Sequence, residues 1–162
     1  MKILVTGGAG FIGSHVVDRY IEEGHEVVVV DDLSCGNINY INKKAKFYLL
    51  DINSPLLKNV FNIEKPDVIN HHAAQISVPY SVANPINDAK INVLGFLNIL
   101  ENSVKYNIKK VIFISSGGAI YGEADEFPTT ENYVPKPLSP YAITKLVAEN
   151  YLYLNTVKFR LN

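Results

Sequence analysis

The sequence predicts an α/β fold built on a doubly wound parallel sheet, and three observations carry this prediction. Short apolar runs, of the kind found in strands buried on both faces, alternate along the chain with segments of helical periodicity. The first run ends in a cluster of glycines that opens the first helical segment. The first two apolar runs and the helical segment between them fit within about thirty residues, which is the length of a βαβ unit. Strands that alternate with helices in this way indicate a parallel sheet covered by helices.

The first βαβ unit lies at the N-terminal end. Residues 2–6 form a β-branched, apolar run, which predicts the first strand. Apolar side chains then recur on one helical face over residues 11–23, and Gly24 ends this helix. Four consecutive valines predict a second buried strand over residues 26–30, which the pair Asp31-Asp32 terminates.

The alternation continues through the rest of the chain. Residues 122–138 are rich in proline and lack periodicity, which predicts a surface loop. Residues 156–162 resemble the beginning of a sixth strand, so we expect a domain over residues 1–155 followed by a truncated end. The other expected elements are strands over residues 45–50, 67–70 and 110–115, and helices over 55–63, 81–106 and from Ser139-Pro140 to about residue 154.

Charge, cysteine content and hydropathy exclude several classes of protein. Fifteen lysines and arginines against sixteen aspartates and glutamates leave a net charge of −1, without the basic footprint of a nucleic-acid-binding protein. Cys35 is the single cysteine, so we expect neither an internal disulfide nor a cysteine-based zinc site, and no metal site is predicted. The N-terminal apolar run is too short for a signal peptide, and no run approaches the length of a membrane helix. These features favour a cytoplasmic protein without a membrane partner.

The glycine-rich turn at residues 8–13 has the Gly-x-Gly-x-x-Gly spacing of a dinucleotide-binding motif. Its first glycine permits a tight turn, Gly10 lets a pyrophosphate approach the backbone, and Gly13 permits close packing of helix on strand. Asp31 closes the second strand, where a carboxylate can accept hydrogen bonds from an adenosine ribose. We therefore interpret residues 1–155 as a dinucleotide-binding Rossmann domain. The alternative is that the glycines only permit a tight turn between strand and helix.

The acidic pair at the end of the second strand bears on the choice of cofactor. Asp31 and Asp32 would repel a 2′-phosphate, and the sequence places no arginine nearby to neutralise one. The sequence therefore favours NAD over NADP. For Asp32 alone, a solvated turn residue is an equally good interpretation.

Tyr141 and Lys145 lie four residues apart, on one face of the last predicted helix. A free tyrosine titrates at about pH 10, too high for a general base at neutral pH. A neighbouring cation favours the phenolate, which can take the proton of an alcohol while a hydride passes to a cofactor. Alone, the pair is more readily explained as part of an amphipathic helix. With the dinucleotide motif upstream, the catalytic interpretation is favoured.

Six motifs follow one another along the chain: Thr6-Gly-Gly-Ala-Gly-Phe-Ile-Gly13, Asp31-Asp-Leu33, Asp51-Ile52, His72-Ala-Ala74, Ser115-Ser116 and Tyr141-x-x-x-Lys145. Their order resembles that of the extended short-chain dehydrogenase/reductases and, within them, the NAD-dependent epimerase/dehydratase family. The resemblance runs from residue 1 to about residue 154, and it is strongest to the UDP-glucose 4-epimerases. It implies a Rossmann fold, NAD, a UDP-sugar substrate and interconversion of UDP-glucose and UDP-galactose by transient oxidation at C4.

The resemblance also implies roles for individual residues. Tyr141 would be the catalytic base, and Lys145 would bind the nicotinamide ribose and tune the tyrosine. Phe11 and Ile12 would lie against the pyrophosphate, and the segment 51–52 would flank the adenine. The full set of residues expected to contact NAD is Gly7, Gly10, Phe11, Ile12, Gly13, Asp31, Asp32, Asp51, Ile52, Ala73, Ala74, Gln75, Asn92, Ser115, Tyr141 and Lys145.

Two of the polar positions have a structural alternative. Asn92 would support the site from the long helix, although a polar helix position without a role also explains it. His71 and His72 are better interpreted as strand-end histidines packed near the cofactor than as metal ligands, because no further ligand is in view.

The sequence departs from the family at its third catalytic residue. Members usually carry Ser or Thr five positions before the glycine of a Tyr-Gly pair, and that position is Gly117 here. Ser116, a bound water or backbone N–H groups would have to replace the hydroxyl, and Ser116 can instead be a serine that caps the turn. The family's 4,6-dehydratases carry an Asp-Glu pair next, where this chain has Gly118 and Ala119, so dehydration is not expected.

Length is the second departure, because family members are about twice as long. The fold is therefore expected to be truncated before the last strands and the substrate domain. Two functions follow: a sugar-nucleotide 4-epimerase or its N-terminal fragment, and a catalytically inactive NAD-binding module. A remnant that does not fold stably is a third possibility. The helices over 81–106 and from Tyr141 resemble the family's dimer interface, so we expect a homodimer where the full fold is present.

Overall fold

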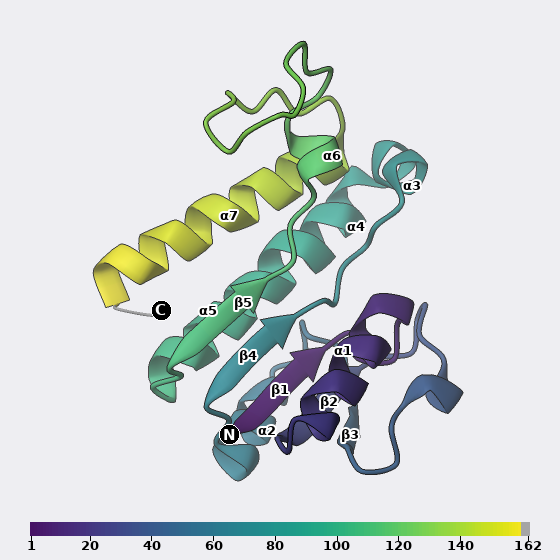
Figure 1. Cartoon of the computed structure of the whole chain (residues 1–162), viewed down its shortest axis with the longest axis vertical. Helices are drawn as coiled ribbons and strands as arrows, with labels where there is room; N and C mark the ends of the chain where they lie inside the picture. Colours follow the sequence, from purple (N-terminus) through teal and green to yellow (C-terminus); the bar gives the residue numbers. More distant parts are fainter. Residues whose placement is uncertain (160–162) are drawn as a thin grey trace.

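The computed structural model describes the backbone of residues 1–159 and the side chains of residues 1–156. Its centre is a five-stranded parallel sheet in the order β3-β2-β1-β4-β5 (Figure 1). This arrangement confirms the predicted doubly wound parallel sheet. The strands are β1 Lys2–Thr6, β2 Glu26–Asp31, β3 Lys46–Leu49, β4 Val68–His71 and β5 Lys110–Phe113.

Helices connect the strands and cover both faces of the sheet (Figure 1). The helix α1 packs on one face, and α2, α5 and α7 contribute to the core on the other. Among the described residues, no helix is both long enough and apolar enough to cross a bilayer. The helices are α1 Phe11–Glu22, α2 Leu57–Glu64, α3 Val78–Ala83, α4 Pro85–Ala89, α5 Gly95–Lys105, α6 Gly117–Ile120 and α7 Pro140–Phe159, with a 3-10 turn at Ile38–Tyr40 and a π-helical turn at Lys90–Leu94.

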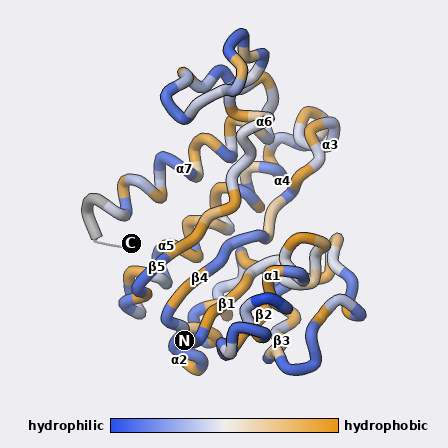
Figure 2. Tube along the Cα trace, viewed as in Figure 1, coloured by the Kyte–Doolittle hydropathy of each residue, from blue (hydrophilic) through white to orange (hydrophobic). Residues whose placement is uncertain are grey.

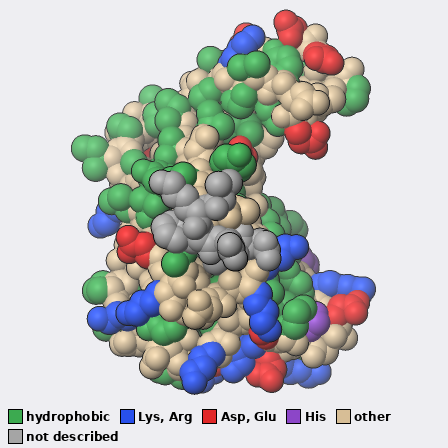
Figure 3. Space-filling view, turned by 90° about the vertical axis from the view of Figure 1, so that its left-hand side faces the viewer, with side chains coloured by type: hydrophobic (Ala, Val, Ile, Leu, Met, Phe, Trp, Pro, Cys, Tyr) green, Lys and Arg blue, Asp and Glu red, His purple; other side chains and the backbone are tan. Residues whose placement is uncertain are grey.

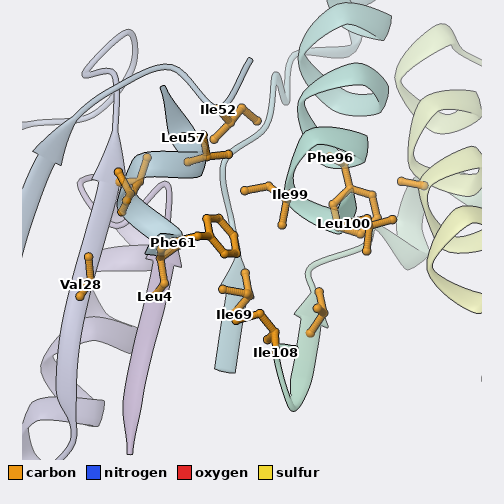
Figure 4. Packing of buried hydrophobic residues seen from close by; sticks show 14 residues of the cluster. Leu4, Val28, Ile52, Leu57, Phe61, Ile69, Phe96, Ile99, Leu100 and Ile108 are labelled. Carbon is orange, nitrogen blue, oxygen red and sulfur yellow. The ribbon is translucent and has the colours of Figure 1, made fainter. Parts of the chain in front are cut away.

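Two apolar clusters, one on each face, hold the sheet and helices together. The side chains of each strand alternate between these faces, so that Leu4 joins the larger cluster while Val5 joins the smaller one with α1. Figure 4 shows Phe61 of α2 between Leu4 and Ile99 of α5. Figure 2 shows β1 and β5 as largely apolar stretches, as expected for strands buried between helical layers.

The long helix expected over residues 81–106 is divided. The chain forms α3, leaves helical geometry at Asn84 (φ −135°, ψ 60°), and begins a new helix at Pro85. Proline has no N–H and its ring clashes with a preceding helical turn, so it suits a first helical position and disrupts a continuous helix. Beyond α4, the π-helical turn at Lys90–Leu94 leads directly into α5.

The prediction of a strand over residues 156–162 is wrong for the first four of these residues, because α7 continues to Phe159. Nothing within α7 after its first residue breaks a helix: the segment has no glycine and no further proline. The side chains of Asn155 and Thr156 also donate hydrogen bonds to the carbonyls of Tyr151 and Leu152, each four residues earlier. The rest of the expected strand, residues 160–162, lies outside the described residues.

The expected loop over residues 122–138 is present and is closed at its base. Lys136 N–H donates to the Ile120 carbonyl (3.0 Å). Gly122 has a φ of +65°, and a Cβ there would lie 2.2 Å from the Lys136 carbonyl oxygen. A short helix that the sequence did not predict, α6, precedes this base. In Figure 3 the outline is hollowed between the upper part, which carries this loop, and the body of the sheet below.

Candidate functional site

The strand order reverses at β1, which lies between β2 and β4, and α/β sheets bind ligands at such a switch point. The glycine turn after β1 meets the segment after β4 here. Gly7 has a φ of +70°, and a Cβ on it would lie 2.5 Å from the Ala73 nitrogen. A Cβ on Gly13 would lie 2.2 Å from the Gly7 carbonyl oxygen. Only glycine therefore fits at Gly13 of the predicted motif and at Gly7, which directly precedes that motif.

The start of α1 presents an unusual surface. Gly10 is its N-cap, and no side chain caps the first turn of the helix. Phe11 and Ile12 follow with exposed fractions of 73% and 62%, high for large apolar residues. The first backbone N–H groups of a helix have no partner within the helix and can bind an anion. The start of α1 therefore fits the role that the family resemblance implies for it, which is to lie against the pyrophosphate.

Asp31 ties the glycine turn to the end of β2. Its carboxylate is buried (7% exposed) and accepts hydrogen bonds from the N–H groups of Ala9 (3.0 Å) and Leu33 (2.8 Å). Asp32 is exposed and accepts from Ser34 N–H (2.9 Å), as a solvated turn residue does. The two neighbouring carboxylates thus have different environments, and only Asp31 is integrated into the turn.

The predicted adenine segment is anchored to α5. Asp51 is exposed and accepts from Asn53 N–H (2.8 Å). The Ile52 side chain is buried in the larger apolar cluster, where it packs so tightly that a Cβ on Gly95 would lie 2.5 Å from it. The Ile52 carbonyl also accepts from Asn98 Nδ2 (2.7 Å). Ile52 therefore positions this turn from the core, and its side chain does not face outward.

Asn92, at the π-helical turn, holds the segment after β4. Its Oδ1 accepts from Gln75 N–H (2.9 Å) and its Nδ2 donates to the Gln75 carbonyl (3.0 Å). The preceding residues are held as well, because Ala73 N–H donates to Thr6 Oγ1 (3.3 Å). The segment containing Ala73, Ala74 and Gln75 is thereby fixed beside the glycine turn.

Tyr141 and Lys145 occupy the first two turns of α7, and both are buried. Ser139 caps this helix by accepting from Ala142 N–H (3.1 Å), and Tyr141 N–H donates to Ser81 Oγ (3.1 Å). The Lys145 ammonium donates to the Ile114 carbonyl (2.9 Å) at the end of β5 and lies 6.0 Å from the centre of the Tyr141 ring. The structure thus brings the predicted pair together on one face of α7.

Burial lowers the pKa of Lys145 from 10.5 to about 8, while the charges of Asp88 and Glu149 oppose this decrease. The ammonium also lies 4.8 Å from the centre of the Phe113 ring. A lysine in this environment is mostly protonated at neutral pH and is close to its titration range.

The two serines after β5 have different surroundings. Ser115 donates a hydrogen bond to Glu149 of α7, so its hydroxyl is directed to that helix. Ser116 is the N-cap residue of α6 and makes no capping hydrogen bond with its side chain. A Cβ on Gly117 or on Gly118 would meet no atom within 4 Å. The position of the missing family hydroxyl is therefore open space beside Ser116.

The two histidines that follow one another at the end of β4 differ in burial. His71 is fully buried and stacks on Phe96, with 5.0 Å between the ring centres. Its Nδ1 lies 2.6 Å from Thr6 Oγ1, within hydrogen-bond distance. Burial lowers its pKa from 6.5 to about 3. His72 is half-buried, and burial lowers its pKa as well. Within the described part of the chain, no three His, Cys, Asp or Glu residues gather as a possible metal site.

Three buried polar residues of this region were missed by sequence reasoning: Ser81, Asp88 and Thr144. Asp88 and Thr144 bond to each other (2.8 Å) and to Asn92, and Ser81 holds the N-terminus of α7. Ser81, Asp88 and Asn92 are spaced by seven and four residues, which is the spacing of one helical face. That spacing does not reveal their partner on α7, because Thr144 lies 56 residues after Asp88.

Comparisons with known proteins agree with this geometry. A UDP-glucose 4-epimerase of Mycolicibacterium smegmatis is 43% identical over 157 residues, which cover 94% of this chain and 50% of that protein. The crystal structure of the Thermotoga maritima UDP-glucose 4-epimerase with UDP-glucose superposes with a TM-score of 0.98 at 50% identity, covering 99% of this chain and 53% of that one.

A second solved structure is equally similar in fold. The Thermus thermophilus UDP-glucose 4-epimerase in complex with NAD gives a TM-score of 0.97 at 41% identity, covering 99% of this chain and 52% of that one. The chain spans about half the length of the curated relatives that it matches. The family model for the NAD dependent epimerase/dehydratase family matches residues 3–158. With nearly all of its residues matched by that model, the chain belongs to the NAD dependent epimerase/dehydratase family.

Proposed function

We propose that this chain is the NAD-binding half, residues 1–155, of a cytoplasmic sugar-nucleotide 4-epimerase that interconverts UDP-glucose and UDP-galactose. The observation that carries the proposal is the buried pair Tyr141 and Lys145, which is held by hydrogen bonds to Ser81 of α3 and to the carbonyl of Ile114, directly after β5. Relatives named UDP-glucose 4-epimerase, one solved with UDP-glucose and another with NAD, support it.

The residues around the switch point fit a dinucleotide. Gly7 and Gly13 keep side chains out of the turn, and the uncapped start of α1 offers N–H groups to a pyrophosphate. Asp31, already bonded to the turn, retains acceptor capacity for ribose hydroxyls, and its charge opposes the 2′-phosphate of NADP. NAD, when bound, would accept a hydride from C4 of the sugar and return it to the opposite face.

In this mechanism Tyr141 acts as the general base. Its phenolate takes the proton of the sugar 4-hydroxyl as the 4-keto sugar forms, and returns the proton to the 4-oxygen after the sugar has rotated. The Lys145 ammonium, 6.0 Å from the tyrosine ring, favours the phenolate and offers N–H donors to the nicotinamide ribose. Lys145 keeps its position because it also donates to the Ile114 carbonyl.

Ser116 is the residue that we propose for the missing third role. It directly precedes Gly117, and its hydroxyl makes no capping bond to α6. The open space at Gly117 leaves room for a sugar oxygen to approach that hydroxyl. Ser115 is less suited to this role because its hydroxyl is bonded to Glu149, although its backbone can still contact the cofactor.

Where the full fold is present, we propose a homodimer formed through two helical segments, the one over residues 85–105 (α4, the π-helical turn and α5) and α7. Exposed apolar side chains lie on them at Ile86 (86%) of α4, Leu94 (58%) of the π-helical turn, and Ile143 (50%) and Leu154 (42%) of α7. On the face drawn in Figure 3, apolar side chains gather over the upper part of the molecule. Two such helices from each subunit would bury these side chains in a four-helix interface.

The second candidate function is an NAD-binding module without activity. One observation favours it: Gly117 stands where the family has its hydroxyl. The two candidates differ in turnover and agree in NAD binding. Calorimetry with NAD and conversion of UDP-galactose by the same sample therefore distinguish them.

The variant that tests the epimerase is Tyr141→Phe, in the longest natural form of the protein that carries this sequence. We expect turnover to fall by about 10²–10⁴-fold, because the general base is lost while the ring remains. Tyr153→Phe is the matched control, since Tyr153 lies on the same helix with 72% of its surface exposed. NAD binding without any turnover in the unaltered protein would favour the inactive module, and full turnover in Tyr141→Phe would reject the mechanism.

A further inference from the structure

A buried carboxylate that the mechanism above does not use lies between the cofactor segment and the catalytic helix. We propose that Asp88 is a positioning residue, which holds the segment after β4 against the turn of α7 that carries Tyr141 and Lys145, and which supplies a buried counter-charge for Lys145. Its role in turnover rests on the proposed function, whereas its effect on Lys145 does not.

The contacts of Asp88 link three parts of the chain. One carboxylate oxygen accepts from Gln75 Nε2 (2.7 Å), after β4, and from Asn92 Nδ2 (3.1 Å), at the π-helical turn. The other accepts from Thr144 Oγ1 (2.8 Å) on α7. Thr144 lies between Tyr141 and Lys145 in sequence, so Asp88 fixes the turn of α7 that carries the catalytic pair.

The burial of Asp88 requires a compensating charge. Its exposed fraction is 0%, and all three of its donors are neutral groups. Removing a carboxylate from water is costly unless it is both hydrogen-bonded and balanced by a cation. Among the side chains of residues 1–156, Lys145 is the one lysine or arginine that is buried. Asp88 and Lys145 are thus buried charges of opposite sign, and Thr144, which bonds to Asp88, directly precedes Lys145.

The other groups near Lys145 do not replace this partner. Glu149, one turn further along α7, is half-buried and accepts a hydrogen bond from Ser115. From β4, His71 and His72 are neutral near pH 7, since burial and the Lys145 charge lower the pKa of both. The Phe113 ring of β5 and the Ile114 carbonyl directly after it are uncharged. Asp88 is the larger of the two charge contributions that raise the pKa of Lys145, and Glu149 is the smaller.

This arrangement predicts a specific effect of removing the charge alone. In Asp88→Asn the side chain keeps its shape, but the buried ammonium loses its counter-charge, so we expect the pKa of Lys145 to fall by about one unit. A neutral Lys145 no longer favours the Tyr141 phenolate, and the alkaline limb of the pH–activity profile would move to lower pH by the same amount.

The test is an NMR titration of the Lys145 side chain in the 162-residue chain, with lysine labelled with ¹³C and ¹⁵N and its signal assigned by loss in Lys145→Arg. Three variants are compared with the unaltered chain. Asp88→Asn removes the charge, Thr144→Val keeps the charge and removes one hydrogen bond, and Glu149→Gln removes the smaller charge contribution. We expect the lysine midpoint to fall by about one pH unit in Asp88→Asn, by less in Glu149→Gln and by the least in Thr144→Val.

Equal midpoints in the unaltered chain and Asp88→Asn would overturn the proposal, as would a shift in Thr144→Val as large as that in Asp88→Asn. A second measurement needs no variant: the ¹³Cγ shift of Asp88 should change at the pH where Lys145 titrates. Absence of that change would overturn the proposal even if Asp88→Asn does not fold. None of these readouts depends on turnover, so an inactive chain can still support the role of Asp88.

Discussion

The buried His71 predicts that the folded chain loses stability in mildly acidic solution. Its pKa is lowered by burial from 6.5 to about 3, so the folded state keeps the ring neutral where the unfolded chain binds a proton. The stabilisation is fully present above pH 6.5 and is lost as the pH falls from 6.5 toward 3. The perturbation is therefore a simple change of pH from 7.5 to 5.

The size of the effect follows from the difference between the two pKa values. At pH 5 the unfolded histidine is almost fully protonated and the folded one is neutral, which corresponds to about 2 kcal/mol of lost stability. The full difference, reached below pH 3, is about 5 kcal/mol. The carboxylates of Glu64 and Asp67, whose pKa values are lowered by their lysine partners, add losses mainly below pH 5. The interval from pH 7.5 to 5 therefore reports mainly on histidine.

Urea unfolding followed by circular dichroism at the two pH values measures this loss. His71→Leu keeps an apolar side chain against Phe96 but cannot bind a proton, so its stability should fall by about 2 kcal/mol less than that of the parent. His15→Gln is the matched control, because His15 is exposed and its replacement should leave the parent's pH dependence unchanged. Equal losses in the parent and in His71→Leu would refute the reasoning.

Three further substitutions test other parts of the structure. Gly13→Ala should lower the melting temperature and abolish NAD binding by calorimetry, because its Cβ would lie 2.2 Å from the Gly7 carbonyl oxygen; unchanged NAD affinity would contradict this. Gly117→Ser should leave stability within about 0.5 kcal/mol, since no atom lies within 4 Å of the new Cβ, and a larger loss in urea unfolding would show that the space is not free. Glu64→Gln should cost about 1–3 kcal/mol at pH 7, because the buried carboxylate accepts hydrogen bonds from Tyr48 and Lys2, and the loss should diminish as the pH is lowered.

The sheet and the dinucleotide turn could be predicted from the sequence because local signals agree there. The glycines at 7 and 13 are required by contacts as short as 2.2 Å, and such requirements leave a fixed spacing in the sequence. Buried parallel strands likewise leave continuous apolar runs, which is why β1 and β2 were expected within a residue of their observed bounds.

What the sequence did not reveal depends on contacts between distant segments. The β-branched residues at the C-terminal end suggested a strand, but strand formation requires a partner, and the helix continues to Phe159. The network around Asp88 joins residues 56 positions apart in the chain, so spacing alone carries no trace of it. The burial of the Ile52 side chain in the core was also not predicted, because a two-residue motif does not specify which side chain points outward; that the segment 51–52 flanks the adenine stays a prediction.

Because the loop at residues 122–138 is closed at its base, a change in its length need not move the residues on either side of it. Its two ends are joined by the hydrogen bond from Lys136 to Ile120 and by the tight contact at Gly122, before α7 begins. Residues gained or lost between these ends would leave the start of α7 where it is. The loop can therefore change in length without displacing Tyr141, the residue that we propose as the general base.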